Sequence, residues 1–169
     1  MLEIRPLTEA DVDPVAVLHV RTWQAGYAGI VPAEVLDAMD PAMLAEHRRT
    51  RPEPPGAQTV VADDNGTIVG FASFGPYRAE DKAEAGEVYA IYVDPDHWGT
   101  GAGRALMDRA KTELAAAGYN EMRLWVFTDN SRARRFYERA GLAPDGEHDT
   151  FTPRGSTEEL PEIRYAGRL

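Results

Sequence analysis

Residues 87–104 read EVYAIYVDPDHWGTGAGR, and the interpretation of the whole chain depends on this segment. The run 87–93 is rich in Val, Ile and Tyr, which favours a strand, and Asp94-Pro95 ends it because a proline restricts the backbone of the residue before it. Three glycines follow within 99–103, and beyond them apolar side chains recur at helical spacing until Gly118 stops the helix. The segment therefore predicts a strand, a glycine-rich loop and a helix in succession.

Apolar spacing and turn residues predict the other elements in the same way. Asn65-Gly66, between two β-rich runs, is a strong hairpin signal. In chain order we predict a strand at 2–6, a helix opened by a capping box at Thr8–Asp11, a second helical region at 26–49, paired strands at 59–62 and 67–74, a polar loop at 75–85, the central strand and helix, a strand at 122–127, a helix from Ser131 to Gly141, and strands near 148–152 and 163–169. This order, β-αα-ββ-β-α-β-α-ββ, indicates an α+β domain in which helices flank a mixed, mostly antiparallel sheet.

The composition is that of a globular protein. With 169 residues, the chain has the usual size of one domain, so we expect residues 1–169 to form a single domain with a core. The absence of cysteine excludes disulfides, thiolate metal sites and a cysteine nucleophile. Residues 1–13 carry acids where a signal peptide needs basic and then apolar residues, and no run approaches the ~18 apolar residues of a membrane span, so we expect a cytoplasmic, unanchored protein.

The net charge of −10 is unevenly distributed. Residues 97–142 hold eight basic and five acidic residues and carry +3, which leaves −13 on the rest of the chain. An acidic chain is a poor binder of duplex nucleic acid, because that affinity depends on basic residues that neutralise phosphates. The local basic region indicates either one polyanionic ligand or a solvated Arg-rich helix face, and the acidic remainder suits a cationic substrate.

The basic region contains the glycine-rich loop at 99–104. Glycines at a helix start let successive backbone N–H groups point at one position, and the helix N-terminus adds positive potential, so a phosphate is the expected ligand. The dinucleotide fingerprint fails because Arg104 stands where a glycine is required, and the Gly-Lys-Ser/Thr of a Walker loop is absent. A purely structural helix-start turn remains the alternative.

Three motifs in order resemble the Gcn5-related N-acetyltransferases (GNAT), a family that transfers an acyl group from acyl-coenzyme A to an amine. Residues 87–95 resemble the family's central strand, Trp98–Arg104 its pyrophosphate loop, and Asn130–Leu142 its Asn…Ala…Phe-Tyr-Glu…Ala-Gly-Leu segment. The element order agrees over essentially the whole chain, so the resemblance implies the family's three-layer fold. One departure is Trp98, where the family loop most often has Gln or Arg.

The resemblance implies acetyl-CoA as cosubstrate and a role for each matching residue. Backbone groups of Ile91, Tyr92 and Val93 would pair with the pantetheine arm like an added strand, and Asn130 would hydrogen-bond the same arm. The loop residues that would cradle the pyrophosphate are Gly99, Thr100, Gly101, Ala102, Gly103 and Arg104. The arginines that would either approach the 3′-phosphate or lie in solvent are Arg132, Arg134 and Arg135.

Acyl transfer to an amine requires a neutral nucleophile, a stabilised oxyanion and a proton for the leaving thiolate. An alkyl ammonium has a pKa near ~10.4, like Lys, so a base or a chain of proton carriers is needed at neutral pH. Because the chain has no cysteine and no Gly-x-Ser-x-Gly elbow, we expect direct attack within a ternary complex. The resemblance places Tyr137 near the sulfur as the candidate general acid, and a core aromatic residue beside Phe136 is the alternative.

The candidate general base is Glu87, on the strand that leads to the cofactor. A carboxylate partly buried there is suited to accept a proton, directly or through water, whereas an exposed glutamate at a strand end is the alternative. Tyr89 and His97 are further candidates. Some members of the family place a glutamate five residues before the asparagine, where this chain has Trp125. That difference leaves a non-catalytic acyl-CoA-binding or regulatory module as the alternative function.

Selection of the amine is expected to fall to the first two helices and the loops around the thioester. Trp23, Tyr27 and Glu34 would form an aromatic and acidic pocket for an ammonium group, with core packing and a surface acid as the alternative. The histidines show no ligand spacing, so we expect no metal. The expected activity is transfer of an acetyl group to a primary amine of a small molecule or peptide. We expect no nucleic-acid or membrane partner, and a homodimer is possible because relatives in the family are commonly dimers.

Overall fold

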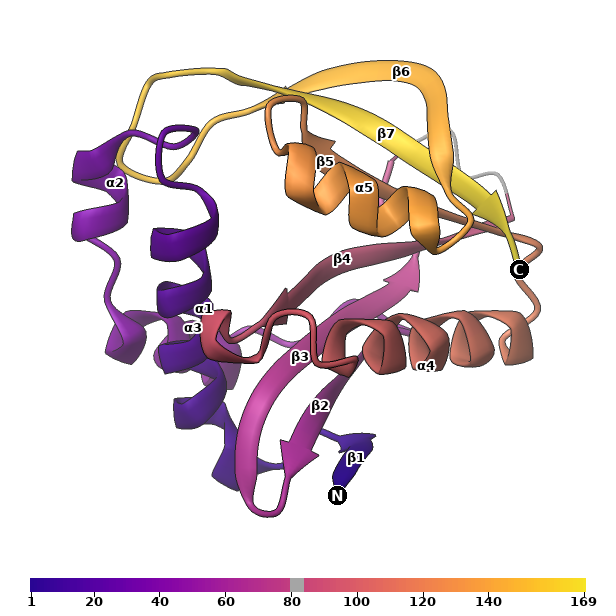
Figure 1. The fold of residues 1–169 in the computed structure, drawn as a ribbon, viewed down its shortest axis with the longest axis horizontal. Coiled ribbons are helices and arrows are strands. Elements are labelled where there is room, and N and C mark those ends of the chain that lie inside the picture. Colours follow the sequence, from indigo (N-terminus) through magenta and orange to yellow (C-terminus); the bar gives the residue numbers. More distant parts are fainter. Residues whose placement is uncertain (80–83) are drawn as a thin grey trace.

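The computed structural model describes residues 1–79 and 84–169, which build a seven-stranded sheet in the order β1-β2-β3-β4-β5-β7-β6 (Figure 1). The strands are β1 (Leu2–Pro6), β2 (Gln58–Asp64), β3 (Thr67–Pro76), β4 (Ala85–Val93), β5 (Glu121–Phe127), β6 (Ala143–Phe151) and β7 (Leu160–Arg168). The α-helices are α1 (Val12–Gly26), α2 (Ala33–Asp37), α3 (Pro41–Thr50), α4 (Ala102–Ala116) and α5 (Ser131–Arg139), with short 3-10 helices η1 (Glu9–Asp11) and η2 (Pro95–His97). β4 and β5 run parallel, and the other neighbouring strands are antiparallel, which confirms the predicted sheet type.

Helices cover both faces of the sheet. Successive strand side chains point to opposite faces, and β2 shows the consequence. Val60 packs in the same cluster as Leu106 of α4, whereas its neighbour Val61 packs with Val15 and Leu18 of α1. α4 and α1 therefore lie on opposite faces of β1 to β4, and the three-layer prediction is confirmed (Figure 1).

Two local predictions are also confirmed. The backbone N–H and hydroxyl of Thr8 both donate to the Asp11 carboxylate at 2.8 Å, and this box opens η1 and then α1. Asn65 and Gly66 both adopt positive φ, 53° and 92°, as the turn of a two-residue hairpin between β2 and β3 requires.

None of the helices in the described part of the chain is long and apolar enough to cross a membrane.

The prediction of one helical region at 26–49 is wrong. The segment holds two helices, α2 and α3, and the break falls at Asp40-Pro41. The Asp40 carboxylate accepts a hydrogen bond from the backbone N–H of Ala42 at 2.9 Å, and Pro41 occupies the first turn. An N-cap aspartate followed by proline starts a new helix and does not continue the old one.

Two strand boundaries also differ from prediction. β6 begins at Ala143 and not near 148, because a bulge between Pro144 and His148 carries Gly146 at φ 93°, so the turn-like residues lie inside the strand. The loop predicted at 75–85 is shorter than expected, because β3 extends to Pro76 and β4 begins at Ala85. Residues 80–83 of that prediction lie outside the described residues.

Candidate active site

β4 and β5 pair over only three residues and then separate. Ala85–Glu87 pair with Glu121–Arg123, although β4 continues to Val93 and β5 to Phe127 (Figure 1). The register with β3 shows a bulge in β4 at Tyr89, directly after the last shared pair. A bulge bends its strand, which accounts for the divergence. Beyond it, the edge of β4 that faces β5 offers backbone groups to a ligand.

The residues predicted to bind the pantetheine arm lie on this open edge. Ile91, Tyr92 and Val93 pair through their other edge with Gly70–Ala72 of β3, so the strand is held firmly on one side. The carbonyl of Val93 accepts a hydrogen bond from Nε1 of Trp98 at 2.8 Å. The tryptophan that departs from the family loop thus ties the loop back to the end of β4.

The glycine-rich loop leads directly into α4. Gly99 and Gly101 adopt φ values of 76° and 97°, and a Cβ added at either position would meet nothing within 4 Å. Gly101 is the N-cap of α4, so this open, left-handed backbone lies at a helix N-terminus, where backbone N–H groups favour a phosphate. A Cβ on Gly103 would lie 3.0 Å from Cε1 of Phe136, so this glycine lets α4 and α5 pack closely.

The other loop residues differ in their exposure. Ala102 is buried, whereas Arg104 is exposed and its Nε lies 4.0 Å from the Asp108 carboxylate. The Thr100 hydroxyl donates to the backbone carbonyl of His97 at 2.6 Å. Arg104 is therefore available to an anion at little cost, because exposed ion pairs contribute little to stability.

α5 brings Asn130 and Tyr137 to the site. Asn130 is buried as the N-cap of α5, and its side-chain oxygen accepts from the backbone N–H of Ala133 at 3.2 Å. Burial raises the pKa of the Tyr137 phenol far above its usual value, with a further contribution from Tyr92. In residues 1–79 and 84–169 the Tyr137 hydroxyl has no hydrogen-bond partner. The phenol is thus protonated and available as a donor.

An aromatic wall borders the site on the α1 side. The centroid of the Tyr27 ring lies 4.8 Å from that of Trp23 and 5.0 Å from that of Phe127. Both pairs are T-shaped, edge-to-face contacts. Burial raises the pKa of Tyr27 well above its usual value, and Tyr92 and Tyr137 add to the effect. The phenols of Tyr27, directly after α1, of Tyr92 on β4 and of Tyr137 on α5 are therefore electrostatic neighbours across the divergence of β4 and β5.

Glu34 is not brought to this wall. Its side chain is exposed on α2, and contacts with the rings of Trp23 and Tyr27 are absent from the described part of the chain. Of the three residues predicted to form the amine pocket, Trp23 and Tyr27 therefore lie together in the aromatic wall, and Glu34 does not.

Glu87 is buried and fully engaged. Its side chain is 3% exposed, and Nη2 of Arg78 lies 2.9 Å from Oε2. The backbone N–H and Nε of Arg78 both donate to Oε1, at 3.0 Å and 3.3 Å. The expectation of a partly buried, available carboxylate is therefore corrected, because both oxygens are occupied by one arginine.

Sequence reasoning missed Glu162, which lies half-buried on β7 opposite Phe127 of β5 and Asp149 of β6. Burial raises the pKa of Glu162 to about 7, with contributions from the negative charges of Asp149 and Glu87 and partial opposition from Arg78. No short motif marks this residue. Its position follows only from the strand order β5-β7-β6.

The three arginines of α5 have different environments. Arg132 stacks on the ring of Trp98, with its guanidinium carbon 3.3 Å from the ring centroid. Arg134 donates to the Tyr165 hydroxyl and to the carbonyl of Thr128, both at 3.0 Å, so its guanidinium has a structural role. Arg135 is exposed.

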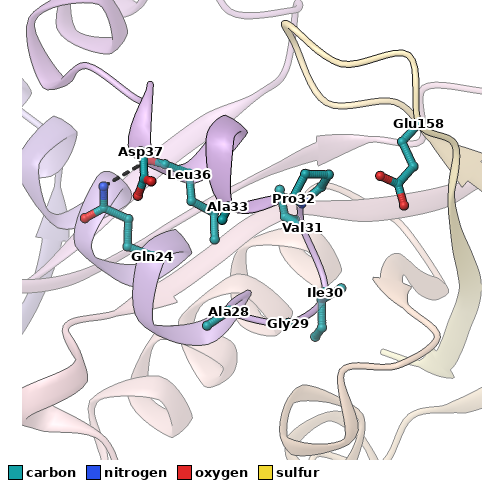
Figure 2. Close-up of a pocket in the computed structure, with 10 residues that line it drawn as sticks. All are labelled: Gln24, Ala28, Gly29, Ile30, Val31, Pro32, Ala33, Leu36, Asp37 and Glu158. Carbon is teal, nitrogen blue, oxygen red and sulfur yellow. Dashed lines mark hydrogen bonds between the residues drawn. The ribbon is translucent and has the colours of Figure 1, made fainter.

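An open pocket of about 650 Å³ lies beside the site (Figure 2). Its lining residues come from the end of α1, the segment after it, α2 and the segment between β6 and β7: Gln24, Ala28, Gly29, Ile30, Val31, Pro32, Ala33, Leu36, Asp37 and Glu158. Gln24 donates to the carbonyl of Leu36 at 3.0 Å. Neither Tyr137 nor Tyr92 lines this pocket, so it is a neighbour of the proposed reaction centre and not its location.

The comparisons with known proteins agree with this geometry. Residues 20–142 match the family model described as the acetyltransferase (GNAT) family. The chain is 32% identical over 130 residues to the uncharacterized N-acetyltransferase YuaI of Bacillus subtilis, covering 77% of this chain and 74% of that protein. It is 28% identical over 166 residues to a probable N-acetyltransferase of Mycobacterium tuberculosis, covering 97% and 92%.

Solved structures share the fold. The PaiA N-acetyltransferase from Thermoplasma acidophilum, solved in complex with coenzyme A, has a TM-score of 0.75 at 19% identity and covers 100% of this chain and 99% of that chain. The diverging strands, the glycine loop and the match over residues 20–142 define an acyl-transferring enzyme. The chain belongs to the GNAT family and is an acetyltransferase.

Proposed function

We propose that the protein transfers an acetyl group from acetyl-CoA to a primary amine by direct attack in a ternary complex. The divergence of β4 from β5 beside the glycine loop carries this proposal. The open edge of β4 supplies strand-like hydrogen bonds, and the loop supplies backbone N–H groups at the start of α4. Asn130 is expected to bond the pantetheine arm through its side-chain nitrogen, since its oxygen caps α5.

The residues present suit an acyl-CoA. Acetyl-CoA supplies a thioester whose carbonyl carbon an amine can attack. The backbone of Ile91–Val93 would hold an extended arm and the loop Gly99–Arg104 a pyrophosphate, the two parts that a coenzyme A molecule presents in succession. The +3 region at 97–142 contains the loop and α5, so its charge falls where the phosphates are expected.

Tyr137 is the proposed general acid. As the carbon–nitrogen bond forms and the carbon–sulfur bond breaks, the bonding pair moves to sulfur, and the phenol donates its proton to the thiolate. The half-buried phenol holds that proton until it is needed, because its desolvation disfavours the phenolate. The ammonium loses two protons in the overall reaction, one of which restores Tyr137 while the other needs a base.

The acceptor is proposed to bind against the wall formed by Trp23, Tyr27 and Phe127. Aromatic faces attract ammonium groups, and the −13 carried outside residues 97–142 favours cations. A small-molecule or peptide amine is the substrate class that this surface fits best.

Calorimetric titration tests the cosubstrate. We expect acetyl-CoA and free coenzyme A to bind with one site per chain, and neither ATP nor NAD to displace them at equal concentration. Equal competition by ATP or NAD would show instead a general nucleotide site.

A further inference from the structure

Two carboxylates lie on the wall of the site that faces α1. Side chains alternate along β5, and Leu124 and Val126 pack in the cluster that contains α4. Arg123 and Phe127 therefore point to the opposite face, where Tyr27, directly after α1, meets Phe127. Directly paired residues share a face, so Glu87, which pairs with Arg123, belongs to this wall.

Glu162 belongs to the same wall because it pairs with Phe127. Directly opposite side chains on neighbouring strands have Cβ atoms about 5 Å apart, so the Glu162 carboxylate starts next to the ring that Tyr27 touches. The wall thus combines aromatic rings with an acid at the open end of the divergence between β4 and β5.

The two carboxylates differ in their partners. Glu87 has both oxygens bonded to Arg78. Glu162, in contrast, has no side-chain hydrogen bond or ion pair within residues 1–79 and 84–169. A half-buried carboxylate without a hydrogen-bonded cation is costly in a folded protein, and a ligand ammonium would offset that cost.

We propose that Glu162, and not Glu87, accepts the proton that the acceptor ammonium must lose before attack. The inference rests on the proposed function and names the base for that reaction. One ammonium proton passes to the Glu162 carboxylate and then to solvent, which leaves a neutral amine. The nitrogen lone pair then forms the bond to the thioester carbon, and the second proton restores Tyr137 after it has protonated the thiolate.

The electrostatic surroundings of Glu162 suit this role. Its pKa of about 7 reflects burial first and then Asp149, across the strand pair on β6, and Glu87 on β4. Arg78, between β3 and β4, acts in the opposite sense. Arg164, two residues along β7, bonds Asp145 and the hydroxyl of Tyr77. A base with a pKa near the working pH is ionised often enough and binds a proton strongly enough to act.

The test is the pH dependence of kcat/KM in Glu162→Gln, measured with one accepted primary amine. We expect a loss of about 10²-fold at pH 7, which is typical of a removed general base. The loss shrinks as the pH approaches the pKa of the amine, because the free amine then needs no base. The inflection near pH 7 that Glu162 gives to the ascending limb of the wild-type profile disappears in the variant, whose activity rises instead toward the pKa of the amine. Acetyl-CoA affinity stays within twofold.

Asp149→Asn is the matched variant, since it removes a neighbouring negative charge and keeps the base. We expect it to retain activity and to shift the ascending limb to lower pH. Glu162→Asp serves if the glutamine variant folds poorly, and it is expected to keep the ascending limb with reduced kcat.

A Glu162→Gln variant with wild-type kcat/KM at pH 7 would overturn the proposal, and so would a loss that stays constant with pH while the ascending limb persists. Either result leaves the acetyltransferase reaction itself in place. Failure of the proposed function looks different, because the wild-type protein would then turn over no amine at any pH.

Discussion

The guanidinium carbon of Arg132 lies 3.3 Å from the centroid of the Trp98 indole ring. Trp98 in turn donates to the carbonyl of Val93, so the end of β4, the glycine loop and the first turn of α5 form one connected unit. A Cβ on Gly26 would lie 3.4 Å from Nη2 of Arg132, so the end of α1 reaches the same guanidinium. This stack joins the proposed cosubstrate side of the site to its acceptor side.

Arg132→Ala is expected to weaken acetyl-CoA binding by about 2–5-fold, the equivalent of one cation–π contact of ~0.5–1 kcal/mol. Arg132→Lys restores part of the loss, because an ammonium attracts the ring but does not stack on it. The control is Arg135→Ala, which removes the same charge from an exposed position on α5. Equal losses in both alanine variants, measured by calorimetry, would indicate a general charge effect and contradict a role for the stack.

Tyr137→Phe is expected to lower kcat by about 10²-fold or more while acetyl-CoA affinity changes by less than twofold, since the phenol is proposed to act on the leaving group. Tyr119→Phe, which removes a hydroxyl outside the site, is the control. Because burial keeps the wild-type phenol protonated, its titration adds no descending limb to the profile between pH 6 and pH 10. Unchanged turnover in thiol-release assays would remove Tyr137 from the mechanism.

The two ends of α4 offer a matched pair of glycines. Gly101 and Gly118 adopt nearly the same φ, 97° and 96°, and both have open space where a Cβ would stand. Alanine at either position is therefore expected to destabilise the fold by a similar ~1 kcal/mol. Only Gly101→Ala should also weaken acetyl-CoA binding, because Gly101 belongs to the loop proposed to bind the phosphates. Equal affinities for the two variants would place the phosphates elsewhere.

Glu162 should make stability depend on pH. The carboxyl has a pKa of about 7 in the folded chain against an ordinary value of 4.5, so its ionisation opposes folding above pH 4.5. The destabilisation grows up to about pH 7 and is constant above it. Glu162→Gln is therefore expected to raise Tm at pH 8 and to change it little at pH 4. Glu159→Gln, at an exposed position, is the control, and an equal Tm gain at both pH values would contradict the assignment.

Much of the fold could be predicted because local signals agree with it. Asn65 and Gly66 readily adopt the positive φ angles that a two-residue hairpin turn needs, so these two residues alone predict the hairpin. The capping box at Thr8–Asp11 likewise marks the start of a helix within four residues. The break at Asp40-Pro41 was readable in the same way, although apolar spacing across it favoured one continuous helix.

The site was predictable where its residues lie in one segment. The glycine loop and α5 are contiguous motifs, so the sequence pattern singles out Gly101, and the resemblance to the family that these motifs carry singles out Tyr137. Glu162 was not, because its place beside Phe127 depends on β7 inserting between β5 and β6. The engagement of Glu87 by Arg78 is likewise a tertiary contact that the sequence does not mark.

Thiol release from acetyl-CoA, measured with a panel of small-molecule and peptide primary amines, tests the central proposal most directly. We expect at least one amine to give release that depends on both substrates, with the N-acetylated product confirmed by mass spectrometry and intersecting initial-rate patterns that mark a ternary complex. Acetyl-CoA binding without release for any amine would contradict the proposed reaction, and parallel initial-rate patterns would contradict direct attack.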